Sequence, residues 1–139
     1  MLSKNILRNK KILKLLSQKC LLSTSSFNDN DVVCVSYARS HIGNFRGKFA
    51  NYSAPELGAK VIKAAVDKAG ISGDIIEEAI MGNVLQAGIG QAPTRQAVIF
   101  SEVGGKEGLV HTPCTTINKV CASGMKSIML AAQSIMCGD

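Results

Sequence analysis

The sequence predicts an α/β domain in which strands and helices alternate in the order β-α-β-α-β-α. Short apolar, partly β-branched runs alternate with segments whose apolar residues recur at helical spacing. Each helical segment is long enough to form the crossover between parallel strands. In addition, 46% of the 139 residues are apolar, which is enough for a hydrophobic core. We therefore expect a parallel or mostly parallel sheet.

The first 30 residues differ in composition from the rest and predict a targeting segment. They hold six cations and a single acid, Asp29, and so carry nearly all of the net charge of +6. On a helical wheel, leucines and isoleucines gather on one face and cations on the other, and serines follow. This combination is typical of a mitochondrial transit peptide, which would deliver residues 31–139 to the matrix. The alternative is a basic surface helix or a helix lying on a membrane surface.

The composition of residues 31–139 argues against several other classes. Ten cations nearly balance nine acids, so no nucleic-acid partner is expected. No run of eighteen apolar residues occurs, so no membrane span is expected. The five cysteines of the chain lack C-x-x-C spacing and a nearby pair of histidines, so we expect free thiols rather than a metal site or a disulfide framework.

Strands are predicted where short runs rich in β-branched or other apolar residues lie between polar or glycine-containing stretches. These runs are residues 31–37, residues 75–84 around Ala79, Ile80 and Met81, and residues 115–120. Residues 38–53 and residues 104–110 are expected to be loops, because they combine glycines with polar residues.

The first helix is predicted to begin at Ser53. Pro55 and Glu56 follow this N-cap, so a first-turn proline and an acid lie near the positive helix end. Apolar residues then continue at helical spacing as far as Gly70, the expected stop. The second helix is predicted over residues 91–103. Its residues expected to face inward are Ala92, Val98, Ile99 and Val103.

The third predicted helix begins at Cys121 and runs to about Cys137. Its apolar residues surround most of the helix axis: Met125, Ile128, Met129, Leu130, Ala131, Ala132, Ile135 and Met136. A helix that is apolar nearly all round is covered on both sides. The other predicted elements can cover one side, so we expect a buried helix whose second side is covered by something absent from this chain.

Cys121 is the candidate nucleophile because it lies where a predicted strand meets a predicted helix. Unpaired N–H groups and the helix dipole favour an anion at a helix start, so a thiolate would be stabilised there. Ala122, Ser123 and Gly124 are small and leave room for a substrate to approach the sulfur. The chemistry of these residues alone leaves an alternative open, in which Cys121 is a small buried residue that closes a tight turn.

Three blocks of sequence resemble motifs of the thiolase family. Residues 112–127, TPCTTINKVCASGMKS, are similar to the acyl-enzyme signature of thiolases, in the version of the acetoacetyl-CoA branch. Residues 81–97, MGNVLQAGIGQAPTRQA, and more weakly residues 38–43, ARSHIG, are similar to two further motifs. The resemblance extends over residues 31–139, and it implies an incomplete thiolase-like half-domain.

The resemblance also implies an acetyl-CoA C-acetyltransferase with Cys121 as its catalytic nucleophile. Cys121 would accept an acetyl group from acetyl-CoA, and a second acetyl-CoA would condense with it to acetoacetyl-CoA, or the reverse. The implied substrates are coenzyme A thioesters, with no further cofactor and no metal; no cofactor-binding residue is identified. The implied partners are a second copy of the chain, as a homo-oligomer, or full-length thiolase subunits, paired through the strand around residues 115–119.

Three departures from the family pattern qualify this expectation. His41 stands where thiolases usually have proline, and residues 100–111 are longer than their usual counterpart. Family members also continue beyond Asp139 with the histidine, second cysteine and asparagine of the active site, so we expect a truncated chain with negligible turnover alone. Two alternatives follow: a non-catalytic fragment that pairs with full-length subunits, and a redox-sensitive matrix protein whose exposed Cys121 is oxidised.

Overall fold

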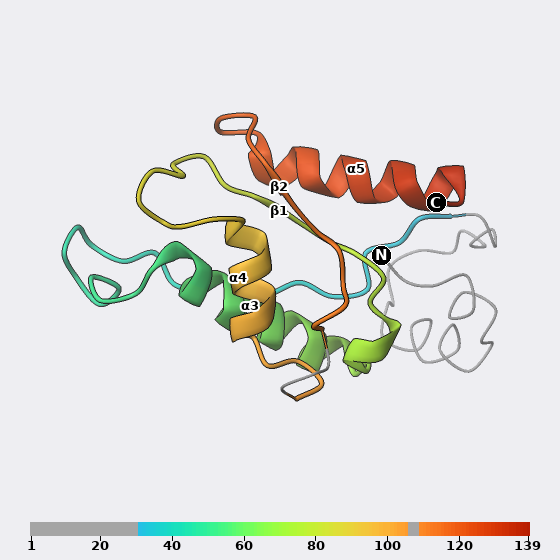
Figure 1. The fold of residues 1–139 in the computed structure, drawn as a ribbon, viewed down its shortest axis with the longest axis horizontal. Coiled ribbons are helices and arrows are strands. Elements are labelled where there is room, and N and C mark those ends of the chain that lie inside the picture. The colour runs from blue at the N-terminus through green and yellow to red at the C-terminus, as the bar shows by residue number, and fades with distance from the viewer. Residues whose placement is uncertain (1–30, 106–108) are drawn as a thin grey trace, which may run out of the picture.

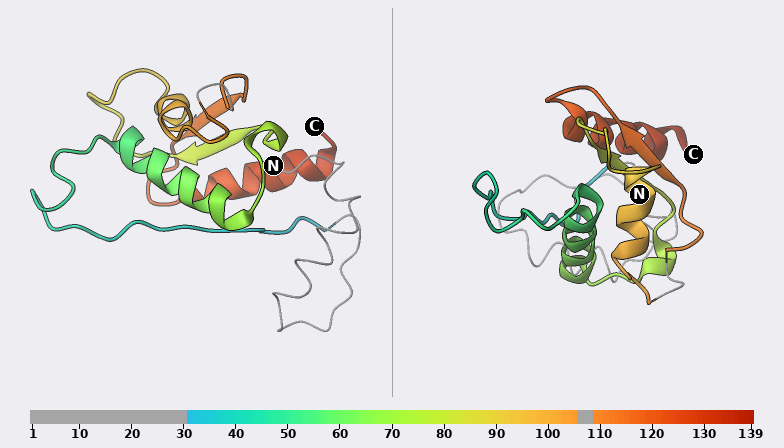
Figure 2. Two further views of the ribbon diagram at one scale, coloured as in Figure 1. Left: turned by 90° about the horizontal axis from the view of Figure 1, so that it is seen from below. Right: turned by 60° about the vertical axis from the view of Figure 1, so that its left-hand side comes forward.

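The computed structural model describes residues 31–105 and 109–139, so the predicted transit peptide lies outside the described residues. In chain order the elements are α3 (Ala54–Ala69), the 3-10 helix η1 (Gly73–Ile75), β1 (Ala79–Gly82), α4 (Pro93–Phe100), β2 (Cys114–Ile117) and α5 (Ser123–Cys137). They form three layers, with α5 on one face of the sheet and α4, backed by α3, on the other (Figure 1). The two views of Figure 2 show the same arrangement.

The sheet consists of β1 and β2, which pair in parallel. Ala79 lies opposite Cys114, and Gly82 lies opposite Ile117. The ladder continues past β1, where Asn83 N donates to Ile117 O at 2.9 Å. Because α4 lies between the two strands in the chain, it belongs to the crossover that parallel strands require. The pairing confirms the predicted parallel α/β fold class.

Helix α3 has the termini that its sequence predicts. Ser53 N donates to Glu56 Oε2 at 2.7 Å, and Glu56 N donates to Ser53 Oγ at 3.4 Å, which completes a capping box. These hydrogen bonds from Ser53, first from its backbone and then from its side chain, lower the pKa of Glu56 below its ordinary value. At the other end Gly70 adopts the left-handed conformation with φ of 66°, which ends the helix.

Helix α4 is shorter than predicted and faces the core differently. It begins at Pro93 because Ala92 has a left-handed φ of 47°, which is incompatible with a helical turn. Val98 is buried as predicted, but Ile99 is 48% exposed, because the next position on a helix points about 100° away. The small core contains Val98, Val103 and Leu109, with Ile62, Val66, Ile76, Ala79 and Cys114 packed against it.

The long segment between α4 and β2 is held in place by Arg95. The guanidinium donates to the carbonyl oxygens of Leu109 at 3.3 Å and Thr112 at 3.1 Å, and also to that of Val110. Residues 106–108 of the predicted loop lie outside the described residues. These hydrogen bonds therefore fix the residues just before β2.

The strand predicted over residues 31–37 is wrong. These residues belong to no strand, because the sheet within the described residues contains only β1 and β2. In Figure 1 the segment runs from beneath the C-terminal end of α5 toward α3. A β-branched run favours an extended backbone, but a strand also needs a neighbouring strand with which to share hydrogen bonds.

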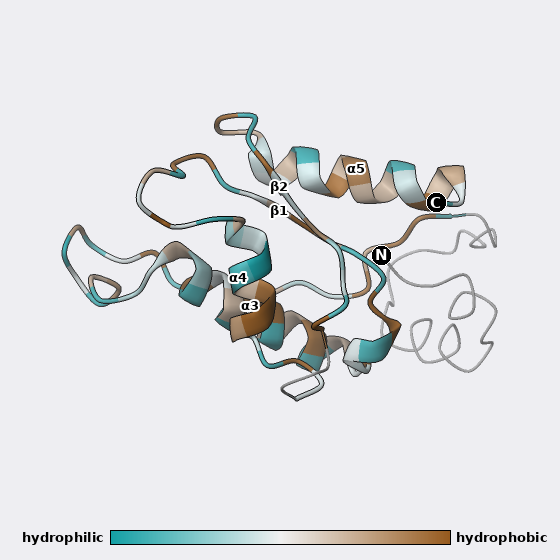
Figure 3. Cartoon of the chain, viewed as in Figure 1, coloured by the Kyte–Doolittle hydropathy of each residue, from teal (hydrophilic) through white to brown (hydrophobic). Residues whose placement is uncertain are grey.

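Helix α5 is covered on one side only, so the predicted burial is not reached in this structure. Its inner side lies on β1 and β2, where Ser123 and Ser127 are buried. In Figure 3 brown and tan bands along α5 alternate with teal and white ones. The exposed apolar residues of α5 are Met125, Ile128, Met129 and Met136.

The segment Val120–Cys137 is also long and apolar enough to cross a membrane, with a mean hydropathy of 1.3. Interior helices of soluble proteins have the same length and composition, so this property alone is weak evidence for a span. The contacts of α5 with β1 and β2 are those of a helix packed on a sheet.

Candidate active site

A tight turn over residues 118–122 joins β2 to α5 and presents Cys121 at the surface. Ala122 N donates to Lys119 O and Ser123 N donates to Val120 O, each at 3.1 Å. Cys121 is exposed and its thiol is free. The helix begins at Ser123, two residues later than predicted. Exposure does not fit the alternative in which Cys121 is a buried turn residue.

The end of β1 packs directly against the start of α5. A Cβ atom added to Gly82 would lie 2.4 Å from the carbonyl carbon of Ser123 and 2.5 Å from Gly124 N. Only glycine allows this approach, because backbone atoms cannot move aside as a flexible side chain can. The contact places Cys121 at the carboxyl edge of the parallel strands, the edge at which α/β proteins commonly bind ligands.

The start of α5 favours negative charge near Cys121. Ala122 at the N-cap provides no side-chain hydrogen bond, and the first turn contains no acidic residue. The hydrogen bond from Lys126 N to Ala122 O, at 2.8 Å, belongs to the first turn of the helix. Backbone N–H groups before that bond have no partner within the helix, and they carry the positive end of the helix dipole.

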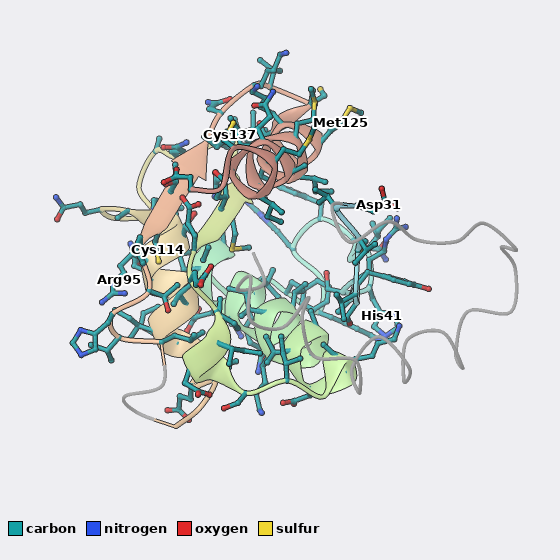
Figure 4. The ribbon with its side chains drawn as sticks, turned by 90° about the vertical axis from the view of Figure 1, so that its right-hand side faces the viewer. Asp31, His41, Arg95, Cys114, Met125 and Cys137 are labelled. Carbon is teal, nitrogen blue, oxygen red and sulfur yellow. The ribbon has the colours of Figure 1, made fainter. Side chains whose placement is uncertain are left out.

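The two histidines lie away from this turn. Figure 4 shows His41 in the loop on the side of the molecule away from α5, whereas Met125 projects from the outer side of α5. His111 is exposed beside Gly73 and Asp74 before β2, so it lies at the opposite end of that strand from Cys121. Neither histidine is therefore placed to exchange a proton with the thiol in this arrangement.

The remaining cysteines and acids form no second cluster in the described part of the chain. Cys34, Cys114 and Cys137 are free thiols, as Cys121 is. Within residues 31–105 and 109–139, no three His, Cys, Asp or Glu side chains come together. The fifth cysteine, Cys20, lies outside the described residues.

Reasoning from the sequence missed the part that three residues play in shaping this turn: Gly82, Asn118 and Ser123. Asn118 and Ser123 hydrogen-bond within the turn, and Gly82 makes room for it. Asn118 carried a local signal, since an asparagine often caps the backbone two residues on. Gly82 carried no such signal, because its neighbour is 41 positions away in the sequence.

The fold and this turn define an α/β protein that presents an exposed cysteine between a parallel strand and the helix that follows it. The chain belongs to the thiolase family: the model of the thiolase N-terminal domain matches residues 32–139. This match confirms the resemblance seen in the three sequence blocks.

Three relatives show how close the similarity is. The chain is 60% identical to a protein of Xenopus tropicalis named "Acetyl-CoA acetyltransferase, mitochondrial" over 109 residues, 78% of this chain and 25% of that protein. Proteins of the same name from Danio rerio and Homo sapiens are 58% and 56% identical, over 78% of this chain and 25% and 24% of their own lengths. The chain thus spans about a quarter of the length of the curated relatives that it matches.

Proposed function

We propose that this chain carries the nucleophile of an acetyl-CoA C-acetyltransferase and that Cys121 is the residue acetylated. The observation that carries the proposal is the exposed thiol of Cys121 at the start of α5, within a match to the thiolase N-terminal domain. Relatives 56% to 60% identical are named mitochondrial acetyl-CoA acetyltransferases, which supports acetyl-CoA and acetoacetyl-CoA as the substrates.

The proposed reaction proceeds in two steps. The Cys121 thiolate attacks the carbonyl carbon of acetyl-CoA, coenzyme A leaves as its thiolate and is protonated, and an acetyl thioester remains on Sγ. A base then removes a proton from the methyl group of a second acetyl-CoA, and the resulting carbanion attacks the acetyl carbonyl. Acetoacetyl-CoA forms and Sγ leaves as a thiolate, which regenerates the free Cys121. The reverse sequence cleaves acetoacetyl-CoA with coenzyme A.

The described residues contribute only part of this chemistry. Cys121 lies beside the start of α5, whereas His111 lies at the other end of β2 and His41 lies in a loop away from α5, so neither histidine is placed to act as the base. General acid–base catalysis contributes about 10²- to 10⁴-fold to such reactions. We infer that the chain alone turns over negligibly, with coenzyme A thioesters as its only small-molecule ligands and no metal.

A second candidate is a non-catalytic role in which the chain pairs with full-length thiolase subunits or with itself. Two surfaces of the described residues favour this role: the outer side of α5 is exposed and apolar, and β2 pairs with β1 alone. Co-purification of the folded chain with an intact subunit supports it. A chain that stays monomeric beside intact subunits contradicts it.

The proposed site of action is the mitochondrial matrix. The relatives are named as mitochondrial proteins, and the composition of residues 1–30 is that of a transit peptide. A fluorescent protein fused behind residues 1–35 is expected to enter mitochondria and lose its leader. A fusion that remains in the cytosol contradicts this location.

The test of the catalytic proposal is the intact mass of the chain after incubation with acetyl-CoA. A single acetyl adduct is expected, lost in Cys121→Ser and kept in Cys137→Ser, which removes the exposed thiol at the other end of α5. An adduct that persists in Cys121→Ser overturns the assignment. If the chain alone gives no adduct, the same measurement is made on its complex with a full-length subunit; no adduct on Cys121 there also overturns it.

A further inference from the structure

The side chain of Asn118 ties the turn that carries Cys121 to the neighbouring loop. Asn118 Nδ2 donates to the carbonyl oxygen of Val84, just beyond β1, at 3.1 Å. Asn118 Oδ1 accepts from Val120 N at 3.0 Å, the two-residue pattern of an Asx turn. One amide side chain therefore connects the exit of β1 to the residue immediately before Cys121.

Ser123 closes the same turn from the helix side. Its side chain is buried, with 3% of the residue exposed. Its hydroxyl accepts from Lys119 N at 2.9 Å and donates to Val120 O at 2.6 Å. Both the donor and the acceptor of this hydroxyl are thus used within the turn. The N–H of Val120 is bonded by Asn118 and its C=O by Ser123.

Val120 needs such support because its backbone is in the left-handed region, with φ of 48°. A β-branched side chain disfavours this conformation, which persists only where the surroundings impose it. Val120 is also 65% exposed, so its own side chain gains little from packing there. Hydrogen bonds on both sides of Val120 therefore supply the restraint that side-chain packing does not.

We propose that Asn118 and Ser123 are positioning residues that hold Val120 left-handed and thereby aim Cys121 for acyl transfer. The catalytic part of this inference rests on the proposed function. Without these hydrogen bonds Val120 returns to negative φ, and the backbone that carries Cys121 turns away from the first N–H groups of α5. The thiol then remains exposed, but it is no longer held in one orientation.

The first test compares Asn118→Ala and Ser123→Ala with the unaltered 139-residue chain. We expect acetylation of Cys121 by acetyl-CoA to slow by about tenfold, the factor expected from one or two ordinary hydrogen bonds. Alkylation of Cys121 by iodoacetamide is expected to change by less than about twofold, because a small reagent needs only an exposed thiol. Acetylation that is unchanged, or that falls only as much as alkylation does, overturns the inference.

Two further variants separate positioning from general stability. Gln86→Ala is the matched control, because Gln86 Nε2 also donates to a loop carbonyl, that of Asn83 at 3.0 Å, three residues away in the chain. It is expected to leave acetylation unchanged. Val120→Gly added to Asn118→Ala is expected to restore most of the lost rate, because glycine adopts positive φ without strain. Failure of Val120→Gly to restore the rate contradicts the proposed role.

Hydrogen exchange distinguishes failure of this inference from failure of the proposed function. In Asn118→Ala the Val120 amide is expected to exchange about tenfold faster, while the Asn83 amide, bonded to Ile117 O, is unchanged. If Cys121 accepts no acetyl group either in the unaltered chain or in its complex with a full-length subunit, the proposed function fails, and exchange alone decides whether Asn118 holds the turn. Unchanged exchange at Val120 overturns the inference whatever the acetylation result. An Asn118→Asp variant keeps the acceptor oxygen, so its Val120 amide is expected to remain protected against exchange.

Discussion

The two long helices, α3 and α5, are nearly equal in length but differ in how they are completed. Helix α3 has 16 residues, a capping box at Ser53, a left-handed Gly70 at its end and a Lys63–Asp67 ion pair of 3.0 Å on its outer face. Helix α5 has 15 residues and also ends at a left-handed glycine, Gly138, but no side chain caps its start. Its outer face carries exposed apolar residues: Met125, Ile128, Met129 and Met136.

This difference separates a helix that its own sequence completes from one that depends on its neighbours. Local hydrogen bonds satisfy both ends of α3, and a polar outer face suits solvent. Helix α5 instead starts on the backbone contact with Gly82 and leaves its outer face uncovered. No side chain caps its start beside Cys121, where the positive end of the helix dipole lies.

Gly82→Ala is expected to give the largest effect, because it strikes the contact on which α5 depends. The new Cβ would meet Ser123 and Gly124 backbone at 2.4 and 2.5 Å, so α5 must move. We expect a loss of about 2 to 3 kcal/mol in the free energy of unfolding, measured by urea denaturation.

Gly58→Ala in α3 is the matched control for that variant. Its Cβ would meet the Ala97 Cβ at 3.1 Å and the flexible end of Met81 at 3.4 Å. The mild crowding is offset by the better helix propensity of alanine, so the change is expected to stay within about 1 kcal/mol. Equal losses for the two variants would contradict a special role for the Gly82 contact.

Ser53→Ala is expected to be next in size, since it removes the capping box of α3. The loss expected is about 1 kcal/mol in the free energy of unfolding, with helix content followed by circular dichroism. Ser72→Ala is the control, because Ser72 precedes η1 without making a side-chain capping bond. If both serines contribute equally, the cap is not what completes α3.

Ile128→Lys tests whether the outer face of α5 is uncovered in solution. Ile128 is 72% exposed, so the free energy of unfolding should change by less than about 0.5 kcal/mol. Binding of a hydrophobic dye should fall, while Gln133→Lys, which adds the same charge at an exposed polar position of α5, should leave it unchanged. A loss above about 1 kcal/mol would instead show that Ile128 is covered, for example by a second copy.

The smallest expected effect is a pH dependence confined to the start of α3. The Ser53 backbone N–H and hydroxyl lower the pKa of Glu56 in the folded chain. The Glu56 carboxylate therefore stabilises the folded state at any pH above the ordinary glutamate pKa. That contribution is lost as pH falls through the lowered pKa. Urea midpoints measured on acidification should decline less steeply in Glu56→Gln, whose amide keeps the acceptor. Equal slopes would contradict the contribution of the Glu56 carboxylate.

The sequence by itself determined the features that depend on residues close together in the chain. The start of α3 at Ser53 and its stop at Gly70 follow from caps within a few residues of each helix end. The order of strands and helices predicted parallel pairing, because a crossover helix makes that pairing the favoured one. The sequence blocks also predicted the thiolase family. The predicted start of the third helix, Cys121, lies two residues before the observed start of α5 at Ser123.

Only the tertiary structure decided the features that depend on distant neighbours. Residues 31–37 favour an extended chain but have no strand beside them, and Ile99 faces outward because α4 turns Val98 to the core. The left-handed Val120 is held by Asn118 and by a serine on α5, and no local propensity predicts a β-branched residue in that conformation. Propensity describes what a segment prefers alone, whereas pairing, burial and strain depend on what lies against it.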